Sequence, residues 1–264
     1  MTTIPEFTEK SELFKWLKEN KHLLITEKKS QIKHADPVSI MVVPGVTNKA
    51  NPELLNLSEI NVKVAINTTS IRDSHKDVHI PGIWKKSLSE NKLIYHLQEH
   101  QMKFDRIISD RVTAYTKTMT WLELGFSYPG NTEVLIFDSA IEKEQNAFMF
   151  EQYAKGRVKN HSVGMQYVKV EMAINSESKF DVDEKAVWDK YINQVANKEE
   201  VEEDGYFFAV TEAKVIEGSA VVLGSNRATP TISAGKALES ADDVTDPQPL
   251  VTDNLINAIK QLAK

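Results

Sequence analysis

The stretch Lys159–Val170 contains the residues best placed to do chemistry. It alternates valine, tyrosine and methionine with small or polar residues, a pattern typical of a β-strand. Ser162 and Gly164 lie two positions apart and therefore share one face of that strand. Because small residues leave room for another group to approach the backbone, a hydroxyl at Ser162 could act as a nucleophile if a base lies within hydrogen-bond reach. Without a base, Ser162 is an ordinary half-exposed strand serine.

A base is available in the segment His96-Leu97-Gln98-Glu99-His100. Acyl transfer by a serine needs an imidazole that accepts the hydroxyl proton and a third group that orients the imidazole. We expect His100 to be the base for Ser162. Two carboxylates are candidates for the orienting group. Glu217 follows an apolar strand and is flanked by apolar residues, and Asp77 lies in a polar loop.

The same segment also has the H-x-x-E-H order of an inverted zinc protease. On a helix, His96 and His100 could bind one Zn²⁺, with Glu99 as the base and a third ligand from the acidic residues downstream. A second, weaker group of possible ligands contains Asp73, His75, Asp77 and His79. A zinc protease is therefore an alternative to the serine enzyme.

Hydrophobic periodicity predicts the elements that would position these residues, and they mix helices with strands. Helices are expected over residues 8–24, 84–100 and 139–153, and a further amphipathic helix around 187–195. Strands are expected at 60–66, within 106–126, and at 133–137, 159–170, 206–216 and 219–223. The predicted fold class is α+β.

The chain divides into three predicted regions. Residues 1–35 form an N-terminal helix and a connector, of which Lys28–Lys33 is expected to be solvated. Residues 36–233 form the main domain, with an acidic helical insertion at 171–204 that carries eleven Asp and Glu against four Lys. Residues 234–264 are expected to form a flexible linker and a C-terminal amphipathic helix.

Composition excludes several classes of function. The 264 residues are 41% hydrophobic, which is enough for a real core, and the formal charge of −6 gives no electrostatic basis for binding nucleic acid or an anionic membrane. The sequence has no cysteine, which excludes disulfides, thiolate catalysis and thiolate metal sites. It also shows no membrane-spanning run and no signal-peptide core, so we expect a soluble, intracellular protein.

Four segments, in order along residues 60–233, resemble the prohead (capsid maturation) serine proteases of tailed phages, which are related to the herpesvirus assemblin proteases. The first is an aspartate-rich segment that ends in Pro-Gly, and the second is a Leu-x-x-His segment. A helix followed by Ser-Val-Gly-Met comes next, and the last is a Glu-x-Ser-x-Val strand. In this chain the four are residues 73–82, 97–100, 161–165 and 215–221.

The resemblance implies a small, mostly antiparallel β-barrel with flanking helices. It implies Ser162 as nucleophile, His100 as base and Glu217 as the likeliest third member, with Asp77 still open. By analogy, the Gly224-Ser225-Asn226 loop would present backbone N–H groups to the oxyanion. No cofactor or metal is implied.

The resemblance also implies partners and a location. The substrates would be the major capsid protein and the scaffold protein, cleaved inside the assembling prohead in the host cytoplasm, and the enzyme would also cleave itself. The resemblance to the assemblin group also allows a homodimer. Neither nucleic acid nor membrane is expected as a partner. The tail after Ser233 is expected to hold a self-cleavage site or a scaffold-docking helix. A non-catalytic head-assembly or scaffold-like protein is the remaining alternative.

Overall fold

The computed structural model describes residues 2–33, 50–90 and 92–236, and these ranges form an α+β fold. The tail after Lys236, with its expected helix, lies outside the described residues. The helices are α1 (Lys10–Glu19), α2 (Lys21–Ser30), α3 (Lys85–Ser89), α4 (Ala147–Ala154), α5 (Val182–Tyr191) and α6 (Lys198–Asp204). Three short 3₁₀ turns cover Pro52–Asn56, Phe104–Arg106 and Ile192–Gln194.

The strands form two sheets. One has the order β1 (Ile32–Lys33), β8 (Asn160–Ile174), β9 (Tyr206–Val221), β4 (Tyr95–Gln98) and β5 (Ile107–Ser109), and β3 (Asp77–His79) also pairs with β9. The other has the order β10 (Thr231–Lys236), β2 (Glu59–Thr68), β7 (Asn131–Glu142) and β6 (Arg111–Thr120). In the described ranges neither sheet closes on itself, so the expected closed barrel is not what this part of the chain forms.

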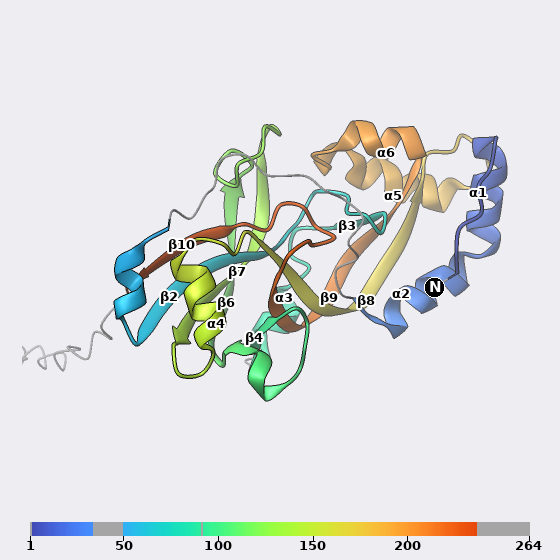
Figure 1. Ribbon diagram of the computed structural model, residues 1–264. Coiled ribbons are helices and arrows are strands. Elements are labelled where there is room, and N and C mark those ends of the chain that lie inside the picture. Colours follow the sequence, from blue (N-terminus) through green and yellow to red (C-terminus); the bar gives the residue numbers. More distant parts are fainter. Residues whose placement is uncertain (1, 34–49, 91, 237–264) are drawn as a thin grey trace, which may run out of the picture.

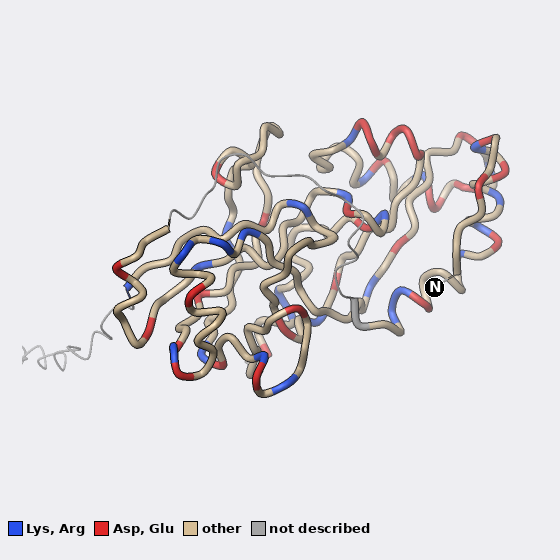
Figure 2. Tube along the Cα trace, viewed as in Figure 1, with Lys and Arg blue, Asp and Glu red and all other residues tan. Residues whose placement is uncertain are grey.

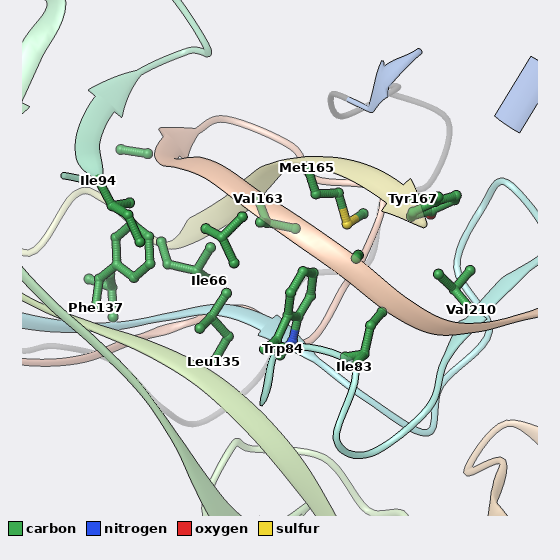
Figure 3. Packing of buried hydrophobic residues seen from close by; sticks show 14 of the residues in the cluster. Ile66, Ile83, Trp84, Ile94, Leu135, Phe137, Val163, Met165, Tyr167 and Val210 are labelled. Atoms are coloured by element: carbon green, nitrogen blue, oxygen red, sulfur yellow. The ribbon is translucent and has the colours of Figure 1, made fainter. Parts of the chain in front are cut away.

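The two sheets enclose one apolar core. Ile66 and Phe137 of the second sheet belong to the same buried cluster as Val163 and Met165 of β8, and Trp84 joins them just before α3. Figure 3 shows these side chains filling the space between the ribbons. Val163 and Met165 therefore mark the core face of β8, and residues 162 and 164 belong to its other face.

The long β8–β9 pair connects the two ends of the molecule (Figure 1). The acidic insertion joins the far ends of these strands and folds as α5 and α6, with Trp188 and Tyr191 packed against Phe207 and Ile80. Helices α1 and α2 lie at the same end, and Figure 2 marks both acidic and basic positions along them.

The N-terminal helices are joined to the insertion and to the core by ion pairs. Lys21 binds Glu184 at 2.5 Å. Lys28 is buried, pairs with the Asp77 carboxylate, and lies 4.2 Å from the centre of the Phe208 ring. The prediction of a solvated connector at Lys28–Lys33 was therefore wrong at Lys28.

All four predicted helices have different bounds. The one expected around 187–195 is α5, which ends at Tyr191 and is followed by the 3₁₀ turn Ile192–Gln194. The one expected over residues 8–24 is two helices that meet at Asn20, whose side-chain amide donates to the Trp16 carbonyl at 2.9 Å. The one expected over 139–153 begins only after Asn146, which accepts from the Met149 N–H, because residues 139–142 continue β7.

The helix expected over residues 84–100 is the error that matters most for the site. Only Lys85–Ser89 is helical, and Tyr95–Gln98 pairs in parallel with β9 as β4. The expected strand at 121–126 is a turn, in which the Glu123 carboxylate accepts from the Thr120 N–H at 2.6 Å and Gly125 has a φ of +86°.

Candidate active site

The register between β8 and β9 places the candidate residues on one face of the sheet. Ser162 lies directly opposite Ser219, and Gly164 lies opposite Glu217. Between them, Gly218 faces the core, because a Cβ there would meet the Phe137 ring at 2.4 Å. Since side chains alternate along a strand, Glu217 and Ser219 point away from the core, to the same side as Ser162 and Gly164.

His100 and Glu217 are joined by a short hydrogen bond on this face. The His100 Nδ1–H donates to Glu217 Oε1 at 2.5 Å, and the Glu217 residue is only 1% exposed. Ser219 holds both partners, since its hydroxyl donates to Glu217 Oε2 at 2.6 Å and accepts from the His100 backbone N–H at 3.0 Å. A buried carboxylate needs such donors to offset the loss of its hydration.

Gly164 supplies the space that Glu217 occupies. A Cβ at position 164 would lie 2.0 Å from Glu217 Oε1 and 2.7 Å from its Cδ. Gly164 has an ordinary backbone conformation, so its lack of a side chain serves the close approach and not a strained turn. The sequence pattern indicated that something approaches the backbone here, and the structure identifies that group as the Glu217 carboxylate.

A strained turn delivers His100 to this face. Gln98 and Gln101 are joined by a backbone hydrogen bond of 3.1 Å, and the two residues between them, Glu99 and His100, have φ values of 53° and 58°. Two successive left-handed residues describe a type I′ turn, which normally uses Asn-Gly. Non-glycine residues in this region cost about 1 kcal/mol each and are concentrated at functional sites.

Ser162 completes the arrangement from the neighbouring strand. It is 6% exposed. Ser162 is the cross-strand partner of Ser219, whose hydroxyl accepts from the His100 backbone N–H, and directly opposed residues of an antiparallel pair have Cβ atoms about 5 Å apart. The structure thus brings His100 and Glu217 into contact and places Ser162 beside them. Their catalytic roles remain predictions.

Of the two carboxylates left open by the sequence, Glu217 is the one that contacts His100. Asp77 is used elsewhere: it pairs with Lys28 and accepts from the Tyr167 hydroxyl at 2.8 Å. His79 Nε2–H in turn donates to the Tyr167 oxygen at 3.1 Å, because the Tyr167 proton already goes to Asp77. Burial lowers the pKa of His79 and keeps its imidazole neutral.

The zinc interpretation required His96 and His100 on one helix face, and the structure separates them. His96 points into the core, where its nitrogens bond the Ser139 hydroxyl at 3.1 Å and the Tyr153 hydroxyl at 3.0 Å. In the ranges that the structure describes, no three His, Asp or Glu side chains gather in a way that could hold a metal ion.

His96 belongs to a chain of hydrogen bonds beneath the site. His161 Nδ1–H donates to the Thr229 carbonyl at 3.0 Å, so its Nε2 accepts the Tyr153 hydroxyl proton at 2.9 Å. His96 Nε2–H must then donate to the Tyr153 oxygen, and its Nδ1 accepts from Ser139. Burial lowers the pKa of His161 to about 4 and that of His96 well below its usual value, so both rings are neutral.

The loop expected to form an oxyanion hole packs beside the start of β8. A Cβ at Gly224 would lie 2.9 Å from the His161 carbonyl oxygen, and the Asn226 side chain binds Thr68 through its Oδ1 at 3.0 Å and its Nδ2 at 2.8 Å. Asn226 is therefore a structural anchor of the loop. A role for the loop's backbone N–H groups stays a prediction.

Ser219 is the site residue to which the sequence analysis gave no role. A signal was present: in Glu217-Gly218-Ser219 the alternation of a strand puts the acid and the hydroxyl on one face, with the glycine between them on the other.

Comparisons with family models, curated proteins and solved structures find no match to this chain. None of the helices in the described ranges is long and apolar enough to cross a membrane.

Proposed function

We propose that the protein is a serine hydrolase in which Ser162 is the nucleophile, His100 the general base and Glu217 the group that orients the base. The observation that supports this most directly is the 2.5 Å bond between a buried carboxylate and His100, on the strand directly beside Ser162. Such a carboxylate holds the imidazole in one orientation and stabilises the imidazolium that forms when the serine is deprotonated.

The proton positions determine which atom acts. Because Glu217 accepts the Nδ1 proton of His100, the Nε2 atom of the neutral ring is the acceptor and can take the Ser162 hydroxyl proton. Ser219 is unsuited as nucleophile, since its only proton is donated to Glu217. Ser162 would attack a carbonyl carbon, the imidazolium would protonate the leaving group, and water would then hydrolyse the acyl-enzyme.

The substrate class in this proposal comes from the resemblance to phage prohead proteases and their assemblin-like fold. The enzyme would be an endopeptidase that cleaves the major capsid protein, the scaffold protein and itself inside the assembling prohead in the host cytoplasm. The order of the four segments along the chain supports this class of substrate, and the His100–Glu217 pair supports the chemistry.

A covalent serine probe tests the chemistry without knowledge of the substrate. The wild-type protein is treated with an organofluorophosphonate and its intact mass and peptide map are recorded. We expect one adduct, located on Ser162, and no adduct in Ser162→Ala or His100→Ala. Ser233→Ala is the matched control because Ser233 is an exposed serine on strand β10, and it should be labelled like the wild type.

Co-expression with the capsid and scaffold proteins tests the substrate class. Ser162→Ala or His100→Ala should abolish their processing while thermal unfolding shows an intact fold. Processing at the wild-type rate in either folded variant would refute the assignment. Labelling with no processing would leave a serine hydrolase with another substrate. A folded wild type that shows neither reaction would instead favour a non-catalytic head-assembly protein.

A further inference from the structure

A closed ring of three hydrogen bonds joins Ser219, His100 and Glu217. The Ser219 hydroxyl accepts from the His100 backbone N–H at 3.0 Å and donates to Glu217 Oε2 at 2.6 Å. Glu217 Oε1 accepts the Nδ1 proton of His100 at 2.5 Å and completes the ring. His100 is therefore held both at its backbone and at its imidazole, which restrains the rotation of the side chain between them.

A hydroxyl is the group that can close this ring with a single atom. Its oxygen accepts one hydrogen bond and donates another, whereas a thiol is a weak donor and a methyl group makes neither bond. Ser219 is 0% exposed, so bulk water does not compete for the two bonds. Both bonds therefore depend on the residue type at position 219.

The Glu217 carboxylate relies on Ser219 for the donor to its second oxygen. Among the described residues, the donors to this carboxylate are the His100 Nδ1–H and the Ser219 hydroxyl. Because Glu217 is only 1% exposed, removing the hydroxyl would leave Oε2 buried without a partner. We expect the carboxylate then to turn toward another donor or toward water, and so to move away from the imidazole.

Ser219 also supports the strained turn that carries His100. Strand β9 binds this turn at two successive N–H groups. The Glu99 N–H donates to the Ala220 backbone carbonyl at 2.9 Å, and the His100 N–H donates to the Ser219 side chain. The bond that depends on a side chain thus lies at a residue with a φ of +58°, a conformation that is unfavourable for residues other than glycine. Losing that bond would allow the turn to relax and His100 to withdraw.

We propose that Ser219 is a positioning residue that acts through His100 and Glu217 and keeps the imidazole where it can take the Ser162 proton. The inference rests on the proposed function, because it assigns Ser219 to the site in which Ser162 is the nucleophile. Ser219 is the cross-strand partner of Ser162, so the ring of bonds is built on the residue opposite the proposed nucleophile. Its loss should slow the chemical step and leave the binding of substrate unchanged.

The rate at which the organofluorophosphonate labels Ser162 tests this role. In Ser219→Ala we expect the maximal labelling rate to fall about 10–100-fold, which is typical of a catalytic group displaced by about 1 Å, with little change in the half-saturating probe concentration. Ser219→Thr keeps the hydroxyl and should recover most of the rate. Thermal unfolding shows whether each variant is folded.

Ser87→Ala is the matched control. The Ser87 hydroxyl is buried and accepts from the Val215 N–H of β9 at 2.9 Å, so this variant also removes a buried hydroxyl that binds the same strand. Ser87 contacts neither His100 nor Glu217 in the described structure, and Ser87→Ala should be labelled at the wild-type rate.

Proton NMR gives a second readout that does not depend on labelling. An imidazole N–H that donates to a carboxylate in a short bond resonates far downfield of the backbone amides, so the His100 Nδ1–H should give such a signal. Its loss in Glu217→Gln identifies it. We expect the signal to move upfield or disappear in Ser219→Ala, to return in Ser219→Thr and to be unchanged in Ser87→Ala.

The outcomes separate the role of Ser219 from the proposed function. Labelling at the wild-type rate in folded Ser219→Ala, or slow labelling with an unchanged downfield signal, overturns the positioning role while the proposed function stands. A Ser219→Thr variant that regains the signal but is labelled as slowly as Ser219→Ala does the same. A wild-type protein in which Ser162 is not labelled overturns the proposed function and the inference with it.

Discussion

The fit between Gly164 and Glu217 predicts a strong coupling between two positions on different strands. Gly164→Ala would place a methyl carbon 2.0 Å from Glu217 Oε1, about 1.4 Å short of the 3.4 Å at which ordinary contacts begin. The carboxylate cannot retreat toward His100, which is already 2.5 Å away. It must therefore move off the imidazole or push the turn at His100 aside.

Both responses destabilise the fold. Forcing a methyl group into a filled site costs about 1–3 kcal/mol, and losing a hydrogen bond to a charged group costs about 1.5–3 kcal/mol. We expect Gly164→Ala to lower the free energy of unfolding by about 2–5 kcal/mol. If the proposed function holds, it should also lower kcat, because His100 loses its orienting group.

A double-mutant cycle isolates the cause. In a Glu217→Ala background the carboxylate is gone, so adding Gly164→Ala should change the free energy of unfolding by less than about 0.5 kcal/mol. Urea denaturation of the four proteins gives the coupling energy directly. Gly235→Ala is the control, since a Cβ there meets no atom within 4 Å. Equal costs of Gly164→Ala in both backgrounds would refute the reasoning.

Three further predictions concern the surroundings of the site. Tyr153→Phe removes the hydroxyl between His96 and His161 and leaves two buried imidazole nitrogens unpaired. The free energy of unfolding, measured by urea denaturation, should fall by about 2–4 kcal/mol. A change below about 0.5 kcal/mol would contradict the hydrogen-bond chain. In the folded protein the pKa of His161 is about 4, below its usual 6.5, so the unfolded chain binds a proton first as the pH falls. The contribution of His161 to the free energy of unfolding is therefore complete above pH 6.5 and should decrease by about 1.4 kcal/mol per pH unit between pH 6.5 and pH 4. The slope of the unfolding free energy against pH gives the number of protons taken up on unfolding. Near pH 5.5 this number should be about one lower in His161→Gln than in the wild type, and equal numbers would count against a neutral buried ring. Glu99→Gly relieves a left-handed residue at φ 53° and should raise the melting temperature, by an amount equivalent to about 0.5–1 kcal/mol; a lower melting temperature would show that the turn is not strained there.

The strands around Ser162 could be predicted because they depend on local alternation. The strand at Lys159–Val170 was expected within a few residues of β8, and the small residues Ser162 and Gly164 correctly marked a close approach. The α+β class likewise follows from the mixture of periodicities. These features depend on neighbouring residues, which the sequence shows directly.

The errors arose where distant contacts decide the structure. Spacing alone made residues 84–100 look helical, but His96 and Leu97 pair with β9, more than 120 positions later. The ion pair between Lys28 and Asp77 likewise joins segments 49 positions apart. The sequence of the basic run alone therefore could not show that one of its lysines is buried. Hydrophobic spacing does not identify such partners, and the tertiary contact overrides the local preference.

The buried Lys28–Asp77 pair limits how far the protein could be shortened. A fragment that begins at residue 36, where the sequence suggests that the main domain starts, would leave the Asp77 carboxylate in the interior without its cation. Removing one partner of a buried pair typically costs about 3–5 kcal/mol, a large share of the stability of a small domain. Helix α2 is therefore part of the folding unit, and removing it should destabilise the rest of the chain.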